Sequence, residues 1–264
     1  MKAIILAGGF GTRLHPLTLE YPKPMIPLAN KPVLAHILKL LKSHHFSEVV
    51  ITVQYLAEQI QNYFGNGCSL GLTLRYAVEE RPLGTAGSIK NVQSYLDDET
   101  FLVISGDLVT DIDLSRAIRF HHQKQALATV VLKRVANPHG YGVVVTERSG
   151  RIRQYLEKPE HQPAISNMVN TGIYILEPKI LDYMEPSQAY DFSYDIFPLL
   201  VAQNTPFFGY LADGYWRDIG TMQSYRQAEA DILAGKVSHI ISHSYNLDRD
   251  ESAFAKPESV ALAV

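Results

Sequence analysis

Short apolar runs alternate with amphipathic stretches through the first half of the chain. The runs have the length and composition of strands, and between them apolar residues recur three or four positions apart, as on one face of a helix. A helix between two strands is the usual crossover that makes those strands parallel. The alternation therefore predicts an α/β fold, in which a doubly wound and mainly parallel sheet has helices on both faces.

The second half of the chain has a different spacing. Beyond Leu127 the strand-like runs follow one another more closely, which predicts antiparallel strands added to the same sheet and a small antiparallel subsheet. We therefore expect a Rossmann-like mixed sheet over residues 1–235 and a polar tail over 236–264. The predicted strands are Ala3–Ala7, Val49–Val53, Leu72–Val78, Phe101–Ile104, Ala126–Val135, Gly142–Thr146, Val169–Leu176 and Phe207–Leu211. The predicted helices are Leu34–Leu41 with Asn30 as its N-cap and Pro32 in its first turn, Ala57–Phe64, Gly87–Leu96, Leu114–Gln125, Tyr194–Gln203 and Thr221–Ala234.

Charge and cysteine content narrow the class of protein. A net charge of -3 disfavours nucleic-acid binding by bulk electrostatics, so an anionic ligand would have to be held by local groups. The single Cys68 cannot form an intrachain disulfide. The first apolar run has five residues, too few for a signal peptide or a membrane span. We expect a cytoplasmic protein without nucleic-acid or membrane partners.

A glycine-rich loop follows the first predicted strand. Gly8, Gly9 and Gly11 allow successive backbone N–H groups to face an anion, while Thr12 adds a hydroxyl and Arg13 a forked cation. Ligands of open α/β sheets bind at the carboxyl ends of strands, which is where this loop lies. The loop matches neither G-x-G-x-x-G nor the P-loop. The structural alternative is a tight strand-to-helix turn with an exposed arginine.

Lys23 lies between two prolines in "YPKPM". The prolines stiffen the backbone on both sides and limit the positions that the ammonium group can reach. This arrangement is consistent with a second phosphate contact, although a surface lysine in a proline-rich connector has the same pattern.

Two distant aspartates form a candidate metal site. Asp107 follows an apolar strand and Gly106, and this glycine leaves room for a bulky anion. Asp218 lies in "GYWRDIGT" after an aromatic pair. Two carboxylates with waters and substrate phosphates are a usual set of ligands for Mg²⁺ in nucleotidyl transfer. Taken separately, each aspartate is also compatible with a turn or an N-cap.

Polar positions beside the later strands form a candidate sugar-phosphate pocket. Glu157 can accept hydrogen bonds from hydroxyls, Lys158 can hold a phosphate, and Asn170 can donate and accept, while Gly142 and Gly172 allow the backbone to approach a ring. The alternative is that Glu157 and Lys158 are a solvated charge pair at a strand end.

One further loop, "EERPLGTAGSIKN", separates a predicted strand from a predicted helix. Gly84 and Gly87 permit close approach of a flat ring, and Thr85 offers a hydroxyl. A capped helix start would also explain the segment.

These motifs together resemble the sugar-nucleotidyltransferases, the nucleoside-diphosphate-sugar pyrophosphorylases. "LAGGFGTRLHPLTLEYPKPM" is similar to their N-terminal signature, and the Asp107, Asp218, E-K-P and N-T-G segments fall at matching relative positions. The resemblance covers about residues 1–235 and implies a catalytic domain, with 236–264 as the start of a truncated extension. It implies that the nucleotide is bound by Leu6, Ala7, Gly8, Gly9, Gly11, Thr12, Arg13, Gly84, Thr85 and Asp107. It implies catalysis by Arg13, Lys23, Asp107 and Asp218, with Mg²⁺ bound by Asp107 and Asp218. The sugar phosphate would be bound by Gly142, Glu157, Lys158, Asn170 and Gly172.

The implied reaction joins a nucleoside triphosphate to a sugar 1-phosphate and releases pyrophosphate. The form G-T-A-G is most similar to that of mannose-1-phosphate guanylyltransferases, which favours GTP and mannose 1-phosphate. Thymidylyl-, uridylyl- and cytidylyltransferases of glucose 1-phosphate stay open, as does a homo-oligomer. So does a silent regulatory homologue that binds nucleotide sugars. A glycosyltransferase is a rival because of the D-x-D at Asp111 and Asp113, but it leaves the glycine loop and Lys23 unexplained.

Overall fold

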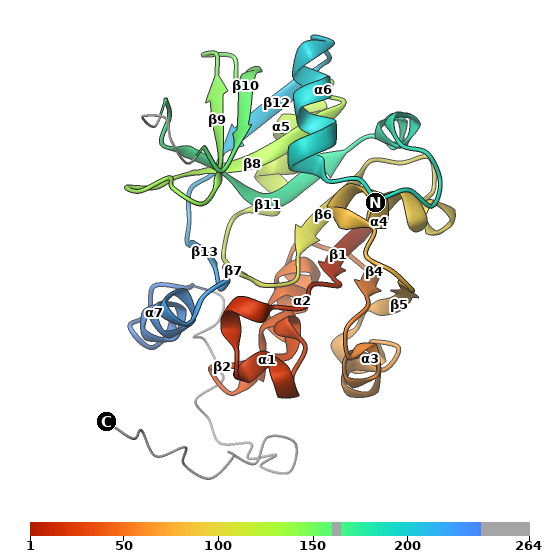
Figure 1. The fold of residues 1–264 in the computed structure, drawn as a ribbon, viewed down its shortest axis with the longest axis vertical. Helices are drawn as coiled ribbons and strands as arrows, with labels where there is room; N and C mark the ends of the chain where they lie inside the picture. The colour runs from red at the N-terminus through yellow and green to blue at the C-terminus, as the bar shows by residue number, and fades with distance from the viewer. Residues whose placement is uncertain (160–164, 239–264) are drawn as a thin grey trace.

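A nine-stranded mixed sheet forms the centre of the protein, as shown by a computed structural model that describes residues 1–159 and 165–238 (Figure 1). The strand order is β10-β9-β11-β6-β1-β4-β5, and β8 pairs with both β11 and β12. The strands of this sheet are β1 (Ala3–Ala7), β4 (Glu48–Val53), β5 (Thr73–Val78), β6 (Phe101–Ser105), β8 (Ala128–Arg134), β9 (Gly142–Thr146), β10 (Ile152–Glu157), β11 (Met168–Leu176) and β12 (Phe207–Leu211).

The sheet has a parallel half and a largely antiparallel half, as predicted. β6, β1, β4 and β5 are all parallel, and the chain returns between them through helices. From β6 onward the neighbours β11, β9 and β10 pair in antiparallel fashion, while β12 lies parallel to β8. The helices are α1 (Leu17–Glu20), α2 (Val33–Ser43), α3 (Ala57–Phe64), α4 (Gly84–Asn91), α5 (Leu114–Lys124), α6 (Phe197–Ala202) and α7 (Met222–Leu233).

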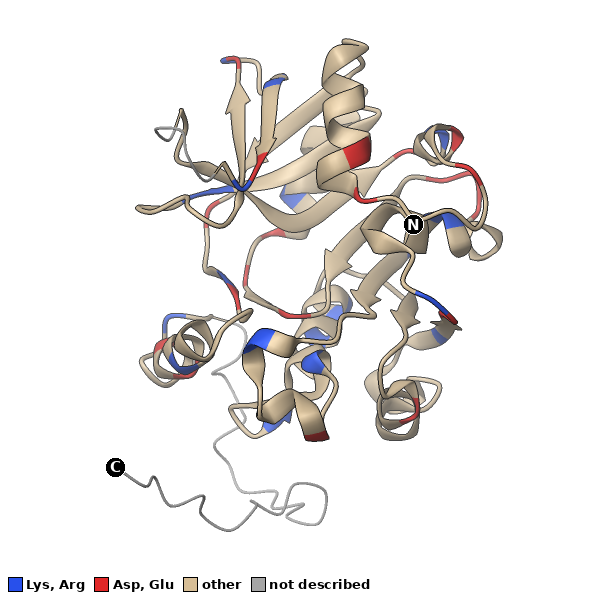
Figure 2. Cartoon of the chain, viewed as in Figure 1, with Lys and Arg blue, Asp and Glu red and all other residues tan. Residues whose placement is uncertain are grey.

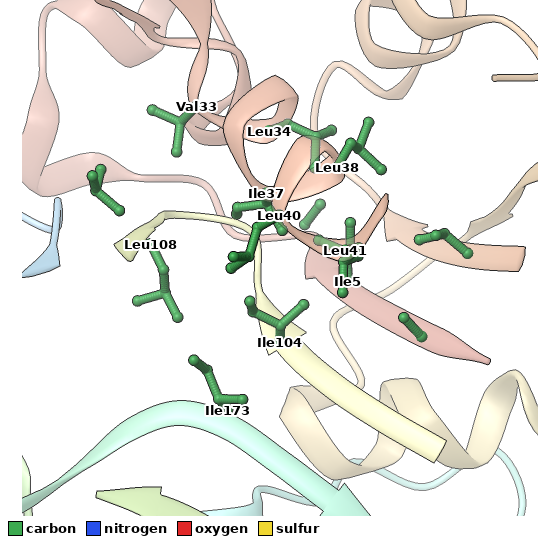
Figure 3. Close-up of a cluster of buried hydrophobic side chains, with 14 of the residues drawn as sticks. Ile5, Val33, Leu34, Ile37, Leu38, Leu40, Leu41, Ile104, Leu108 and Ile173 are labelled. Carbon is green, nitrogen blue, oxygen red and sulfur yellow. The ribbon is translucent and has the colours of Figure 1, made fainter. Parts of the chain in front are cut away.

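Alternation along β1 separates two cores. Ile5 packs with α2 and with Ile104 of β6 on one face of the sheet, and Figure 3 shows this cluster. Its neighbour Ile4 points to the other face, where the apolar side chains of α4 and α6 cover it. Both isoleucines are fully buried. Because both faces are apolar here, the central parallel strands β1, β4 and β6 read as nearly continuous hydrophobic runs, which made them easy to predict.

Two small antiparallel sheets lie outside the main sheet. β2 (Pro27–Leu28) pairs with β3 (Lys31–Pro32). β7 (Leu108–Thr110) pairs with β13 (Trp216–Asp218), which brings two segments more than a hundred residues apart into register. The second of these sheets positions both candidate metal ligands.

Several helix ends differ from the predicted ones. Helix α2 begins at Val33 with Pro32 as its N-cap, and Asn30 is not a cap but adopts a left-handed conformation with φ 64°. Helix α4 begins at Gly84 and ends at Asn91, and a separate 3-10 turn follows it. The predicted helix from Tyr194 starts instead as a π-helical turn (Phe192–Ile196), capped by Asp191, before α6.

Charged residues are interspersed over the described part of the chain (Figure 2). Among those residues, no helix has the length and apolar content that a bilayer crossing requires. Of the predicted polar tail, 239–264 lie outside the described residues.

Candidate active site

Two cavities open side by side at the carboxyl ends of the parallel strands. The larger has a volume of about 570 Å³ and the smaller about 180 Å³. Arg13, Ser105 and Asp107 line both of them, so the cavities meet at these three residues. A ligand in one cavity therefore has its end beside a ligand in the other.

The predicted nucleotide residues all line the larger cavity, and the predicted sugar residues all line the smaller one. The first group comprises Leu6, Ala7, Gly8, Gly9, Gly11, Thr12, Arg13, Gly84, Thr85 and Asp107, and the second Gly142, Glu157, Lys158, Asn170 and Gly172. Lys23 lines the larger cavity, and Asp218 the smaller. The structure thus brings together residues from five separate motifs, while their roles stay predictions.

The glycine loop leaves open space only at its start. A Cβ at Gly9 would meet nothing within 4 Å, and one at Gly8 would keep at least 3.6 Å from its neighbours. Gly11 has a different reason for being glycine, because its φ is 67° and a Cβ there would lie 2.8 Å from Thr18. The loop then turns into a 3-10 turn (Thr12–Leu14) that carries Arg13.

Lys23, Asp107 and Asp218 form one charged cluster. Lys23 begins a 3-10 turn (Lys23–Met25), and its Nζ forms an ion pair with Asp107 and lies 3.8 Å from Oδ1 of Asp218. The β7–β13 pairing places Asp218 opposite Leu108, and the Ile219 N–H donates to the carbonyl of Asp107 at 3.2 Å. The two aspartates are neighbours in space despite their distance in sequence.

Burial shifts the pKa values in this cluster. Burial raises the pKa of Asp218 to about 6, and the neighbouring charge of Asp107 acts in the same direction. Burial alone would lower the pKa of Lys23, but the charges of Asp107 and Asp218 outweigh it, so that this pKa lies above its ordinary value. Lys23 is therefore a cation at neutral pH.

The cluster fits a divalent cation. Oδ1 of Asp218 is buried and has no hydrogen-bond partner among the described residues. A buried carboxylate oxygen without a donor is costly, and an ion of opposite charge would remove that cost. Two carboxylates from different segments are also a chemically suitable oxygen donor set for a hard cation.

Gly106 next to Asp107 is required by the sheet and not by a ligand. We expected this glycine to leave room for a bulky anion, but a Cβ there would lie 2.9 Å from the carbonyl oxygen of Leu6 in β1. The close approach of two strand ends explains the residue. In helix α4 the backbone of another segment comes equally close: a Cβ at Gly84 would meet the Tyr190 carbonyl at 2.4 Å, and one at Gly87 that of Gln188 at 2.6 Å.

The hydroxyl of Thr85 is engaged within the protein. It donates to Oδ2 of Asp191 at 2.9 Å and accepts from the Phe192 N–H at 2.9 Å. Thr85 lines the cavity, but these contacts tie α4 to the segment before α6. Thr85 therefore positions the cavity wall.

The smaller cavity has a connected polar wall. The Asn170 amide donates to the hydroxyls of Tyr155 at 2.9 Å and Tyr174 at 3.0 Å, and its oxygen accepts from the Gly172 N–H. Tyr155 in turn donates to Glu157 at 3.2 Å. Asn170, predicted as a free donor and acceptor, has its amide and its oxygen already engaged.

Glu157 and Lys158 differ in exposure. The Glu157 side chain is only 12% exposed, whereas Lys158 is 47% exposed and keeps its Nζ 3.4 Å from the Glu157 carboxylate. Lys158 has φ 42°, a left-handed conformation directly after the end of β10. Nearly half of the Lys158 side chain is thus open to solvent, whereas Glu157 is largely enclosed.

The rival D-x-D motif has structural partners. Asp113 is the N-cap of α5, accepting from the Arg116 N–H at 2.9 Å. Asp111 accepts from the backbone N–H groups of Tyr215 and Ser238. Neither aspartate lines the two cavities.

Sequence reasoning missed several lining residues. Trp216 and Tyr141 form the aromatic side of the smaller cavity, with ring centroids 5.4 Å apart. Trp216 lies two residues before Asp218 on one strand, a spacing that places both on one face and was a usable signal. Glu79, at the carboxyl end of β5, was also overlooked.

Comparison with known proteins gives a consistent family. A model described as nucleotidyl transferase matches residues 2–235. The chain is 40% identical over 91% of its length to a Synechocystis protein named UTP–glucose-1-phosphate uridylyltransferase, and 36% identical over 89% to one named mannose-1-phosphate guanylyltransferase from Mycobacterium tuberculosis. It spans 65% of the length of each relative.

Solved structures have the same fold. A putative glucose-1-phosphate thymidylyltransferase from Bacillus anthracis, in complex with sucrose, superposes with TM-score 0.81 at 26% identity, covering 93% of this chain and 99% of that one. HddC from Yersinia pseudotuberculosis, in complex with GMP-PN, gives TM-score 0.76 at 26% identity, covering 88% and 99%. With the matched residues extending over nearly all of the described fold and both cavities, this chain belongs to the nucleotidyl transferase family.

Proposed function

We propose that the protein transfers a nucleotidyl group from a nucleoside triphosphate to a sugar 1-phosphate. The observation that supports this most directly is the meeting of the two cavities at Arg13, Ser105 and Asp107. The larger cavity has room for a nucleotide beside an anion-binding loop, and the smaller has hydrogen-bonding groups and an aromatic wall suited to a sugar. Two anions bound there would face each other across the shared residues.

The reaction balances without a protein-derived base. A phosphate oxygen of the sugar 1-phosphate forms a bond to the α-phosphorus, the bond from that phosphorus to the bridging oxygen of the β-phosphate breaks, and pyrophosphate leaves. With a second pKa of about 6, a phosphate monoester is mostly dianionic at neutral pH. The protein therefore has to position two anions and neutralise their charge.

The cations of the site are placed for this task. Arg13 lies where the two cavities meet, and Lys23 lines the larger one, so both can balance charge on the triphosphate and leaving pyrophosphate. The exposed Lys158 can attract the sugar phosphate, while the buried Glu157 can accept from sugar hydroxyls. Trp216 offers an apolar face for the ring.

Enzymes of this family generally use a divalent metal, and we propose Mg²⁺ here. Asp107 and Asp218 would hold it, and when bound it would supply charge neutralisation for the reacting phosphates. The unpartnered Oδ1 of Asp218 supports this assignment. Lys23 keeps the two carboxylates together by its contacts with both.

For the substrates we propose GTP and mannose 1-phosphate. The G-T-A-G segment supports this choice, as does the number of relatives named mannose-1-phosphate guanylyltransferase. A uridylyl- or thymidylyltransferase of glucose 1-phosphate is the second candidate, because one relative at 40% identity has the first name and a solved structure with the same fold has the second. Both kinds of substrate are cytoplasmic metabolites, and we expect the protein to act there.

A pyrophosphate-release assay tests the proposal. Five nucleoside triphosphates are combined with mannose, glucose and N-acetylglucosamine 1-phosphates, with and without Mg²⁺. We expect release that depends on both substrates and is abolished by EDTA. Absence of release in every combination would favour a silent nucleotide-sugar-binding homologue, and sugar transfer to an acceptor without pyrophosphate chemistry would favour a glycosyltransferase.

Lys158→Ala tests the placement of the sugar phosphate. Because Lys158 is exposed and contacts only the smaller cavity, we expect KM for the sugar 1-phosphate to rise by about tenfold, the value of one charge-assisted contact, with KM for the triphosphate unchanged. The exposed Lys179→Ala is the matched control. An effect confined to the triphosphate would contradict the placement.

A further inference from the structure

A network of hydroxyl and amide groups lies behind the polar wall of the smaller cavity. Glu157 and Asn170 line this cavity, whereas Tyr155 and Tyr174 do not line it and are each only 5% exposed. The four side chains come from β10 and β11, and hydrogen bonds connect them. The tyrosines therefore determine which hydrogen-bonding sites Glu157 and Asn170 still offer to a ligand.

Asn170 has no proton left for a ligand. Its amide nitrogen donates one hydrogen to the Tyr155 hydroxyl at 2.9 Å and the other to the Tyr174 hydroxyl at 3.0 Å. The side-chain oxygen accepts from the Gly172 N–H at 2.9 Å, which fixes the orientation of the amide group. A carboxamide has two N–H donors and an oxygen with two acceptor sites, so one acceptor site is left. Asn170 can therefore accept a hydrogen bond from a ligand but cannot donate one.

The direction of the Tyr155 hydrogen bond follows from its partners. The hydroxyl lies 3.2 Å from Oε2 of Glu157 and 2.8 Å from Oγ of Ser193, and it accepts from Asn170. A phenol has one proton, and a carboxylate is a stronger acceptor than a hydroxyl, so Tyr155 donates to Glu157 and Ser193 donates to Tyr155. Glu157 is ion-paired with Lys158 and, when ionised, has only acceptor sites.

The fold holds Tyr155 in this position from two sides. Ser193 belongs to the π-helical turn that Asp191 caps. On the other side, a Cβ at Gly142 of β9 would lie 2.6 Å from Oε2 of Glu157 and still closer to the Tyr155 hydroxyl, so both groups pack directly on the backbone. Burial raises the pKa of Tyr155, which therefore keeps its proton at neutral pH. The protein itself thus sets the direction of these hydrogen bonds.

We propose that Glu157 and Asn170 present only hydrogen-bond acceptors to the sugar, with Tyr155 as the residue that positions them. This inference rests on the proposed function in taking the smaller cavity as the sugar site. The cations Arg13 and Lys158 also line the cavity and provide donors for the phosphate. The wall then selects sugar 1-phosphates whose hydroxyl groups donate to it. A fluorine in place of such a hydroxyl can only accept, so it should be as harmful as a hydrogen.

Binding of sugar analogues tests the proposal without relying on turnover. Isothermal titration compares mannose and glucose 1-phosphates with derivatives in which each ring hydroxyl in turn is replaced by hydrogen or by fluorine. Where a hydroxyl faces Glu157 or Asn170, we expect the deoxy compound to bind about 10- to 100-fold more weakly than the parent, roughly the loss of one hydrogen bond to a charged group. At those positions the deoxyfluoro compound should bind as weakly as the deoxy compound.

Tyr155→Phe tests the positioning role. Loss of the hydroxyl frees one Asn170 proton and removes a donor from Glu157, so the wall gains a donor while its carboxylate loses a fixed position. We expect the parent to bind about tenfold more weakly, and the deoxyfluoro compound to bind better relative to the deoxy compound than in the wild type. Tyr76→Phe is the matched control, because its hydroxyl also forms a hydrogen bond, to the Gly65 carbonyl at 2.7 Å, but lies on the edge strand β5 outside both cavities.

The outcomes separate this inference from the proposed function. Deoxyfluoro compounds that bind as well as the parent wherever the deoxy compound binds weakly would reveal a donor in the wall and overturn the inference alone. Deoxy compounds that all bind like the parent would also overturn it. An unchanged ratio of deoxyfluoro to deoxy affinity in Tyr155→Phe would contradict the role of Tyr155, and the wild-type comparison decides even if this variant does not fold. Absence of binding by every sugar 1-phosphate would overturn the proposed function as well.

Discussion

Two carboxylates near strand β13 have opposite surroundings: Asp218 at the end of the strand and Asp231 on helix α7, which packs against it. At the cavity junction Asp218 has a buried oxygen without a hydrogen-bond partner, and its pKa is raised to about 6 mainly by burial. At the contact of β13 with α7, Asp231 accepts hydrogen bonds from Lys236, Tyr215, Arg217 and Gln227. Burial acts to raise its pKa too, but these partners lower it to about 2.

Under the proposed function, the difference separates a structural carboxylate, Asp231, from a metal-binding one, Asp218. Asp231 is buried to 3% exposure, yet its donors compensate for the lost hydration. Asp218 has Lys23 and Arg13 nearby but remains under-satisfied, which lowers the stability of the fold while keeping an anionic oxygen available. A site that binds cations benefits from such an incomplete shell, and a helix contact does not.

The largest expected effect is on activity and follows from replacing Asp218, the carboxylate in the cavity. Asp218→Asn should reduce pyrophosphate release by about a thousandfold or more, since the loss of a metal-mediated term costs several kcal/mol. Stability should be unchanged or higher, because a buried charge without a full set of partners is removed. Single-turnover assays and thermal unfolding of the metal-free protein measure the two. Asp213→Asn, at an exposed position nearby, is the control, and an unaltered rate in Asp218→Asn would contradict the assignment.

The same substitution at Asp231 should lower stability and leave activity nearly unchanged. Asp231→Asn leaves Lys236 and Arg217 without their shared anion, so we expect a loss of about 2–3 kcal/mol in the free energy of unfolding. The rate per folded molecule should stay within about threefold of wild type, a small change on the scale of a catalytic group. Urea unfolding at pH 7 checks the first expectation. A loss of turnover with unchanged stability would mean that Asp231 belongs to the site.

Stability as a function of pH sharpens the comparison further. The folded pKa of Asp218 is raised, so its contribution is fully present below the unfolded value of about 3.9 and is lost as pH rises through about 6. The folded pKa of Asp231 is lowered, so its contribution is present above about 3.9 and is lost as pH falls toward 2.

Unfolding measured between pH 7.5 and 3 in the two asparagine variants separates these trends. The wild type should gain stability relative to Asp218→Asn as pH falls from 7 to 4.5. Its advantage over Asp231→Asn should hold through that range and shrink below about pH 4. Parallel pH profiles for the two variants would show that the carboxylates do not differ.

How far the sequence predicts this molecule depends on the length of the signal. The eight strands predicted from apolar runs are all present, and the central strands β1 and β6 gave the clearest signal because they are buried on both faces and apolar almost throughout. β7 and β13 were not predicted as strands, since three residues are too few for a periodic pattern. The six-residue β10 was not predicted either, and its register shifts between Ile152 and Gln154, which interrupts the alternation of a regular strand. Asn30 was mistaken for an N-cap because its residue type suits a cap, whereas the local turn places it at positive φ.

For the candidate site, the sequence predicted the residues but not the hydrogen bonds of their polar atoms. The sequence indicated which residues line the cavities, since motifs at strand ends converge on one edge of the sheet. It did not indicate which polar atoms are already engaged. Asn170 and Thr85 were interpreted as available donors, but Asn170 already donates to Tyr155 on strand β10 and Thr85 to Asp191, which is more than a hundred residues away. Asp231 was overlooked because its importance lies in which partners it has.

The smallest expected effect tests whether the partners of Asp231 act as a unit. The Tyr215 hydroxyl donates to Oδ2 of Asp231 at 2.9 Å and accepts from Nε of Arg217 at 3.0 Å. Tyr215→Phe removes both hydrogen bonds but leaves the Arg217–Asp231 ion pair, so we expect a loss of about 1 kcal/mol in the free energy of unfolding. Tyr183→Phe is the control, since no hydrogen bond of its hydroxyl is found within the described residues.

A double-mutant cycle then measures how much of the stabilisation by the Tyr215 hydroxyl depends on Asp231. If the hydroxyl stabilises the fold through Asp231, Tyr215→Phe should cost about 0.5 kcal/mol or less in an Asp231→Asn background, because its charged acceptor is already gone. Full additivity of the two substitutions would mean that Tyr215 acts through packing alone. The hydrogen bonds to Asp231 would then be independent contacts. Asp231 would differ from Asp218 only in how many partners it has, and not in having partners that strengthen one another.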